Sequence, residues 1–226
     1  MFHHFSLRVS HGLLLCAAAF LTSLSQTAGA SSLDTLARFL QTTRSGRADF
    51  TQVVTPPAKA GQASRSKISS GRFAFVRPSR FRFDYRKPFE QVIVADGETL
   101  WLYDVDLEQI TAKPQAQALG NTPAALIATA SDTAALQKDF VLQPQADAEG
   151  LIWVLATPKD REGSLQSVRI GLRAEGDGVA LAKLDITDAL GQRSVLTFDR
   201  FISNPRDLGA ADFRFVPPKG VDVLRP

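Results

Sequence analysis

Three carboxylates, those of Asp104, Asp106 and Glu108, stand at alternate positions just after a pair of aromatic residues. Carboxylates beside an aromatic ring serve glycosidases as acid and base, and clustered carboxylates also bind calcium. Three carboxylates spaced two apart share one face of a strand or turn, however, whereas a glycosidase pair has to flank its bond from opposite sides. We therefore expect a solvated surface here and keep a carboxylate-only hydrolase as the enzyme alternative.

The start of the chain, over residues 1–30, has the pattern of a secretory signal peptide. Arg8 is its only Lys or Arg, an apolar run extends from Leu13 to Leu21, and Ala28-Gly29-Ala30 forms a small-residue cleavage site. The run is too short to span a bilayer, which takes about twenty apolar residues. We expect export, cleavage after Ala30, and a single domain over residues 31–226.

Cleavage there removes every histidine and the single cysteine, which are His3, His4, His11 and Cys16. A mature chain without imidazole or thiol excludes Ser-His and Cys-His nucleophile pairs and the usual zinc and iron sites. The G-x-x-x-x-G-K-[ST] phosphate loop is missing from the sequence, and the formal net charge of +3 is not gathered into a cluster of the kind that binds nucleic acid. We expect a binding protein with no cofactor, no metal and no nucleic-acid partner.

Hydrophobic periodicity predicts one helix followed by many strands. Apolar residues three and four apart predict a helix from Ser31 to about Thr43, with Ser32 as its cap. Period-two alternation then predicts two aromatic strands over 72–76 and 80–86. Further strands are expected at 91–95, 100–104, 109–112, 140–143, 151–156, 167–173, 180–187 and 194–200.

The breaks between these strands are short and rich in turn residues, which indicates one antiparallel sheet curling into a barrel or sandwich. Residues 55–67 are polar and predict a hairpin loop. A helical pattern from Asn121 to about Lys138 interrupts the strands, with Asp132 as the candidate cap of its last part. Such a helix could cover a curved sheet that does not close on itself.

Five rings occupy alternate positions of the two aromatic strands: Phe73, Phe75, Phe81, Phe83 and Tyr85. They either pack an ordinary core or, because few helices are available to cover the sheet, line an apolar pocket for an acyl chain. Proline in Arg77-Pro78 marks the turn between the strands. Arg77 itself is either a solvated charge or a donor to free carbonyls at a helix C-terminus, which would latch a lid.

From Gly71 to Ala128 the order and spacing of residues resemble the periplasmic outer-membrane lipoprotein carrier family, LolA. The resemblance is carried by Gly71, Arg77-Pro78, Phe81-Arg82-Phe83, Tyr85, Pro88, Ile93-Val94, Asp96-Gly97, Leu100-Trp101, Tyr103, Gln109, Thr111, Asn121-Thr122-Pro123 and Leu126-Ile127-Ala128. Residues 48–52 and 213–221 also look like the family, and the resemblance is weakest between Ser131 and Leu208.

The resemblance implies a mainly β fold with some α, in which an incomplete antiparallel β-barrel is covered by a helical lid and encloses an apolar cavity. It implies a soluble periplasmic chaperone, working as a monomer, that carries the acyl chains of lipoproteins. Its partners would be lipidated lipoproteins, an inner-membrane ABC-type releasing complex and a receptor lipoprotein on the outer membrane.

The resemblance also assigns roles to residues. Arg77 would latch the lid helix at Leu126, Ile127 and Ala128. The cavity would be lined by Phe73, Phe75, Phe81, Phe83, Tyr85, Val94 and Trp101. One departure is Ala124-Ala125, which puts small side chains where larger apolar ones are expected on the lid. A carrier of another envelope lipid or glycolipid remains the alternative binding function.

Overall fold

Alternation of apolar and polar residues builds most of this chain into strands. The computed structural model describes residue 1 and residues 28–58, 64–118 and 130–226. Its strands are β1 (Ser45–Thr55), β2 (Lys67–Val76), β3 (Arg80–Lys87), β4 (Gln91–Ala95), β5 (Thr99–Asp104), β6 (Gln109–Pro114), β7 (Phe140–Ala148), β8 (Leu151–Pro158), β9 (Leu165–Glu175), β10 (Gly178–Asp188), β11 (Arg193–Ser203) and β12 (Val223–Leu224). The predicted strands are all present, and β1 and the short β12 are added to them.

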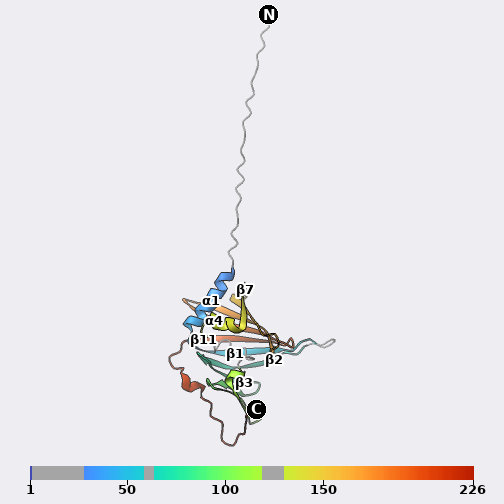
Figure 1. The fold of residues 1–226 in the computed structure, drawn as a ribbon, viewed down its shortest axis with the longest axis vertical. Helices are drawn as coiled ribbons and strands as arrows, with labels where there is room; N and C mark the ends of the chain where they lie inside the picture. Colours follow the sequence, from blue (N-terminus) through green and yellow to red (C-terminus); the bar gives the residue numbers. More distant parts are fainter. Residues whose placement is uncertain (2–27, 59–63, 119–129) are drawn as a thin grey trace.

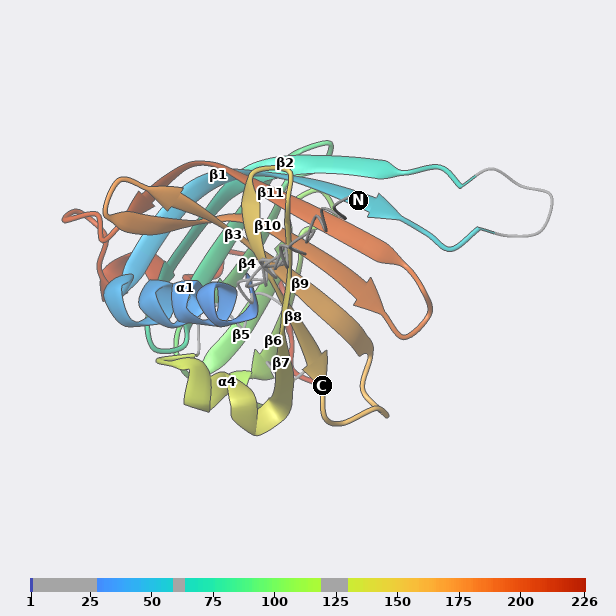
Figure 2. The ribbon, with the colours of Figure 1, turned by 90° about the horizontal axis from the view of Figure 1, so that it is seen from above.

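All twelve strands belong to one sheet, in the order β12-β6-β5-β4-β3-β2-β1-β11-β10-β9-β8-β7. Strands β2 to β6 form one meander and β7 to β11 form a second, each pairing with its neighbour in sequence. The pairing of β1 with β11 joins the two meanders, and only the short β12 runs parallel to its neighbour. In the described part of the chain β7 and β12 stand at opposite edges without pairing, so the strongly curved sheet stays open (Figure 2). The predicted incomplete antiparallel barrel is confirmed.

Helices α1 (Ala28–Thr42) and α4 (Thr133–Asp139) lie across the inner face of the curved sheet (Figures 1 and 2). Helix α1 buries Leu36 and Leu40 of the predicted apolar stripe in the core, together with Phe39. It begins earlier than expected, so that Ser32 is a buried helical residue and not a cap.

Helix α4 confirms the predicted cap. The Asp132 carboxylate accepts a hydrogen bond from the backbone N–H of Ala135 at 2.8 Å, which satisfies a donor that the first turn leaves unpaired. Two shorter pieces, α2 (Gln115–Ala118) and the 3-10 turn η2 (Ala210–Phe213), complete the helical elements described. No helix in the described part of the chain is long and apolar enough to span a bilayer.

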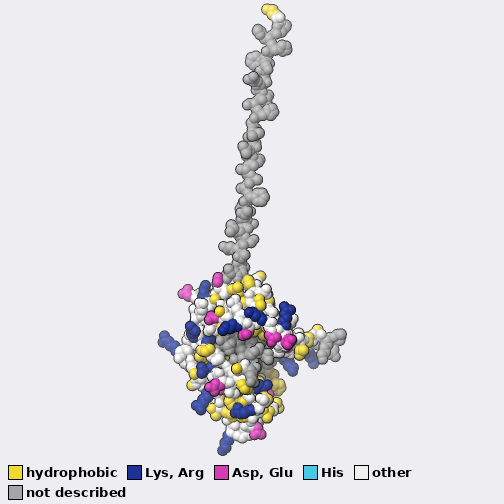
Figure 3. Space-filling model, viewed as in Figure 1, with side chains coloured by type: hydrophobic (Ala, Val, Ile, Leu, Met, Phe, Trp, Pro, Cys, Tyr) yellow, Lys and Arg dark blue, Asp and Glu magenta, His cyan; other side chains and the backbone are white. Residues whose placement is uncertain are grey.

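Charged side chains of both signs are interspersed with apolar ones on the face that Figure 3 shows. The three carboxylates lie at the end of β5 and in the turn that follows it. Asp104 accepts a hydrogen bond from the backbone N–H of Leu107, and Asp106 and Glu108 are exposed. Among the described residues no cluster of His, Cys, Asp or Glu is suited to hold a metal ion.

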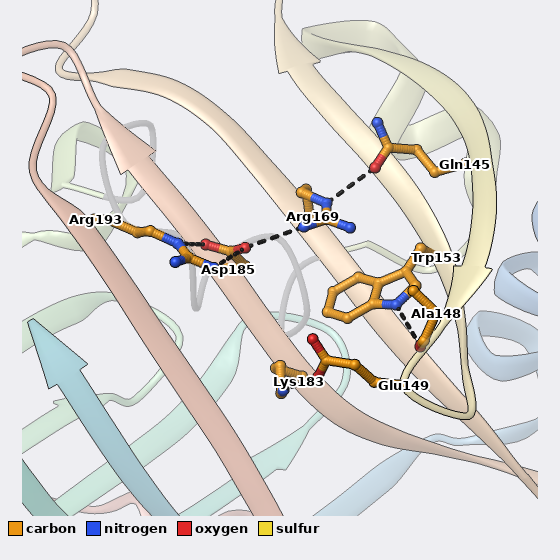
Figure 4. A network of polar contacts seen from close by, with 8 residues as sticks. All are labelled: Gln145, Ala148, Glu149, Trp153, Arg169, Lys183, Asp185 and Arg193. Atoms are coloured by element: carbon orange, nitrogen blue, oxygen red, sulfur yellow. Dashed lines mark hydrogen bonds and ion pairs between the residues drawn. The ribbon is translucent and has the colours of Figure 1, made fainter.

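A network of polar side chains covers the outer face of the second meander (Figure 4). The Asp185 carboxylate, whose side chain is 7% exposed, accepts hydrogen bonds from Arg193 at 2.8 and 2.9 Å and from Arg169 at 3.3 Å. Arg169 also lies over the ring of Trp153, with its guanidinium carbon 4.5 Å from the centroid. The hydrogen bonds from Arg193 hold the pKa of Asp185 below its ordinary value.

We expect Asp185→Asn to destabilise the protein by about 2 kcal/mol at pH 7, or roughly 4–8 °C in Tm. A carboxyl whose folded pKa is lowered stabilises the fold above its unfolded pKa of about 4, and this contribution disappears as the pH falls through the folded value. The gap in Tm between the two proteins should therefore close as the pH is lowered from 5 towards about 2 in thermal unfolding experiments. Glu149→Gln, at an exposed ion pair with Lys183, is the control and should leave Tm unchanged. A gap that persists undiminished in acid would contradict this assignment.

Candidate functional site

An apolar cavity of about 360 Å³ opens between the two meanders on the inner face of the sheet. Its volume is within the range of pockets that hold small molecules, roughly 300–1,000 Å³. Its lining comes from β1, β3, β4, β10 and β11 and from the start of β9: Gln52, Val54, Phe81, Phe83, Tyr85, Ile93, Ser164, Leu165, Leu184, Ile186, Asp188, Gln192, Ser194 and Leu196. Most of this wall is aliphatic or aromatic, so the cavity suits a hydrocarbon chain.

Three of the five predicted rings, Phe81, Phe83 and Tyr85, line this cavity directly. They alternate along β3, and period two therefore places all three on its inner face. Phe50 on β1 holds two of them in place, with edge-to-face contacts to Phe83 at 5.2 Å and to Tyr85 at 4.9 Å between centroids. Burial raises the pKa of Tyr85 to about 12, so its phenol stays protonated at neutral pH.

The other two rings, Phe73 and Phe75, lie on the inner face of β2 beside Phe83 and Phe81 and are not among the residues that line the cavity. Both are buried, with 1% and 0% of their surface exposed. Phe73 stacks on Phe75 and packs against Phe83 and Phe198. These rings pack beside the lining residues of β3 and support them.

Val94 and Trp101 require a correction, because they face the opposite side of the sheet. Val94 pairs with Arg82 on one side and Trp101 on the other, whereas the inward Ile93 pairs with Phe83. Trp101 packs against Phe215, and its indole N–H donates to Asp96 at 2.8 Å. Phe215 of the C-terminal segment packs against Trp101 and Tyr103 on this outer face, where both Trp101 and Phe215 are half-buried.

Arg77 is buried at the turn between β2 and β3 and connects three parts of the fold. Its Nε donates to the carbonyl of Thr43, just after α1, at 2.8 Å, and its Nη1 donates to the carbonyl of Ala130 at 2.7 Å. The guanidinium lies 5.4 Å from the Phe39 ring centroid and 5.0 Å from that of Phe75. Burial, with Arg44 adding to it, lowers the pKa of Arg77 to about 10, so the side chain is still charged at neutral pH.

The expected partners of Arg77 on the lid, Leu126, Ile127 and Ala128, lie outside the described residues, as do Ala124 and Ala125. The Ala130 bond nevertheless attaches Arg77 to the chain just before α4. The side chain thus contacts carbonyl oxygens, as the latch hypothesis requires, at the end of one helix and at the entry to another.

Eleven of the fourteen lining residues were missed by reasoning from the sequence. Leu184, Ile186 and Leu196 sit on strands that the alternation predicts correctly, and Gln52 sits on β1. Their even spacing within each strand was a usable signal for an inward face. The alternation gives no indication, however, that β10 and β11 stand opposite β3.

A family model described as outer membrane lipoprotein carrier protein LolA matches residues 41–216. The chain belongs to the LolA family. An outer-membrane lipoprotein carrier protein of Albidiferax ferrireducens is 60% identical over 198 residues, which cover 88% of this chain and 92% of the relative. The relatives of the same name from Leptothrix cholodnii and Neisseria meningitidis serogroup B are 50% and 37% identical, over 94% and 90% of this chain and 92% of each relative.

A solved structure of an uncharacterized conserved protein from Thermus thermophilus has a similar fold. It superposes with a TM-score of 0.50 at 14% sequence identity and covers 87% of this chain and 98% of its own. The likeness concerns the fold alone. It supports the arrangement of one open, curved sheet with helices on its inner face, within which this LolA chain places its apolar cavity.

Proposed function

We propose that this protein carries lipoproteins by enclosing their acyl chains in the cavity between the two meanders. The observation that supports this most directly is the cavity itself, with Phe81, Phe83 and Leu196 in its wall. Its relatives at up to 60% identity bear the name outer-membrane lipoprotein carrier protein, which supports the same cargo here. The chemistry needed is shielding, which an apolar wall provides without a reactive side chain.

Energetics explain why such a carrier needs an imperfect pocket. Burying a methylene contributes about 0.8 kcal/mol, so two or three acyl chains represent tens of kcal/mol that cannot be left in water. A pocket that matched the chains perfectly would not release them. Closure of a lid over the empty cavity competes with cargo, and the two states are then closely balanced. Arg77 is the residue we assign to hold the closed state.

The partners and location follow from the same function. Residues 1–30 act as a signal peptide that is cleaved after Ala30, and the single domain over 31–226 works in the periplasm as a monomer. An inner-membrane ABC-type complex loads the carrier, and a receptor lipoprotein on the outer membrane unloads it. Transfer runs towards the better binder at each step, so no nucleotide has to bind this chain.

Adjacent residues on β4 provide a matched test of the cavity. Ile93 lines the cavity, whereas its neighbour Val92 faces the outer side, and both are half-buried. Ile93→Glu places a charge against the acyl chains and should weaken binding of a triacylated lipopeptide by at least about 3 kcal/mol, or roughly a hundredfold. Val92→Glu should bind as the unchanged protein does.

The same pair is tested in cells depleted of the native protein, in which lipoproteins are followed by membrane fractionation. Complementation with the Val92→Glu protein should deliver them to the outer membrane, and the Ile93→Glu protein should leave them at the inner membrane. The proposed function is wrong if lipoproteins reach the outer membrane in depleted cells and none co-purifies with the protein.

A further inference from the structure

The inner face of the sheet changes from apolar to polar along its strands, towards the exposed end of the cavity. On β3 the inward residues run from Phe81, 0% exposed, through Phe83, 5% exposed, to the half-buried Tyr85. The same order holds on two other strands, with Leu184, Ile186 and Asp188 on β10 and Phe198, Leu196 and Ser194 on β11. Val54 is the apolar exception among the residues at this exposed end of the cavity. The cavity is therefore amphipathic along its length, with an apolar floor and a polar mouth.

A chain of hydrogen bonds crosses the mouth. The Tyr85 hydroxyl donates to Gln52 Oε1 at 2.9 Å, and Gln52 Nε2 donates to Ser194 Oγ at 2.7 Å. Gln52 lies between Phe50 and Val54 on the inner face of β1, at a position where the pattern would favour an apolar residue. The bonds to Tyr85 and Ser194 hold its amide in one orientation across the opening.

This chain of bonds leaves two hydrogen-bond donors on residues that line the cavity. A glutamine amide carries two N–H groups and a serine hydroxyl carries one O–H. Ser194 takes one N–H of Gln52, and within the described residues no acceptor takes the other or the Ser194 hydroxyl hydrogen. A ligand with acceptor oxygens at this depth would satisfy both donors, which otherwise depend on water.

The charges at the mouth indicate which acceptors fit. Among the described residues that line the cavity there is no Lys or Arg, and the one charged side chain is the carboxylate of Asp188. A phosphate group at this level would meet a like charge with no cation to offset it. The uncharged carbonyl oxygens of esters and amides match neutral donors without that repulsion.

We propose that Gln52 and Ser194 form a polar subsite for the ester or amide carbonyls that join the acyl chains of the cargo to its head group. The subsite favours lipids with an uncharged linkage region over lipids that carry a phosphate there. This proposal rests on the proposed function, because it assumes that acyl chains occupy the apolar floor beneath. Within that function it assigns a specificity-determining role to two residues of the cavity wall.

The test compares ligands that differ only in the linkage. The purified full chain is titrated with a fluorescent lipopeptide bearing two ester-linked chains, with its ether-linked analogue of equal chain length, and with phosphatidylglycerol of the same chains. The unchanged protein should bind the ester form about tenfold more tightly than the ether form, which lacks the carbonyl acceptors. Phosphatidylglycerol should bind more weakly than the ester lipopeptide.

Variants then show which residues are responsible for the preference for ester-linked chains. Gln52→Leu and Ser194→Ala should each reduce the preference for the ester form to about threefold or less. Thr197→Val is the matched control, because it removes a hydroxyl from the same strand on the opposite face and should keep the full preference. Ser194→Ala is the smaller change and decides the question should Gln52→Leu fail to fold.

The possible results distinguish failure of the polar-subsite proposal from failure of the proposed carrier function. Equal binding of ester and ether forms by the unchanged protein, or an unchanged preference in Ser194→Ala, overturns the subsite while the carrier function stands. Tight binding of phosphatidylglycerol overturns the selectivity against phosphate. Failure of the unchanged protein to bind any lipopeptide counts against the carrier function itself.

Discussion

Arg77→Leu is expected to yield a folded protein that holds its cargo and releases it about tenfold more slowly. A hydrogen bond from a charged donor to a carbonyl contributes about 1.5–3 kcal/mol, and the Ala130 bond acts on the segment just before α4. In the proposed mechanism, loss of this bond weakens the closed state that competes with cargo. A loss of about 1.4 kcal/mol in closure corresponds to a tenfold change in the balance between empty and loaded protein.

The fold should survive this change because leucine can occupy the apolar space between Phe39 and Phe75. Transfer of a labelled lipoprotein to its receptor in solution measures the effect, together with the amount of lipoprotein that co-purifies. Arg82→Leu is the control, since Arg82 follows on β3 but pairs with Asp84 at 2.8 Å on the outer face. Release at the unchanged rate by Arg77→Leu would refute the latch.

Gly71→Ala is expected to have the largest effect on stability. A Cβ at this position would lie 2.0 Å from the carbonyl oxygen of Asp84 and 2.9 Å from the Cα of Tyr85. Both are backbone atoms of the paired strand β3, at the register shift between Ser70 and Gly71, so no side chain can turn aside to make room. We expect a loss of about 3 kcal/mol or more, or roughly 6–12 °C in Tm.

The clash should also displace Tyr85, and the affinity for a lipopeptide in the cavity should fall as a result. Thermal unfolding and lipopeptide binding measure the two effects on one sample. Gly209→Ala is the matched control, because a Cβ there meets no atom of the described residues within 4 Å, and Tm should stay within about 1–2 °C. If the Gly71→Ala protein had the same Tm as the unchanged protein, β2 and β3 could separate locally at little cost in free energy.

Much of the fold could be predicted because one face of each strand is apolar. Alternation located β3, β4 and β5 almost to the residue, and the Asp132 cap located α4. Strand β1 was not predicted from periodicity, since its second half, 51–55, reads Thr-Gln-Val-Val-Thr and alternates poorly. Its path is determined by pairing with strands on both sides, which is a property of the assembled sheet.

Which residues face the cavity could not be predicted from single segments of the chain. Ile93 and Val94 are both apolar, so hydropathy cannot tell which of them faces inward. An apolar residue is suited to both faces here, because Phe215, far later in the chain, packs against Trp101 on the outer face. In the same way, Leu184 and Leu196 could be placed on strands but not opposite Phe83 until the β1 and β11 pairing was known.

The pairing of β1 with β11 also determines when the sheet can be completed. Its partners are far apart in the chain, as in the ion pair of Asp49 and Arg200, which are separated by 151 residues. If the chain is exported from its N-terminus, the first meander can form early, but β1 then presents a bare edge beside an apolar face until β11 has crossed the membrane. Unpaired edges of this kind recruit other strands, and distant pairings form slowly. Under the proposed export, the chain is therefore expected to be most prone to aggregate between the export of β2 and that of β11.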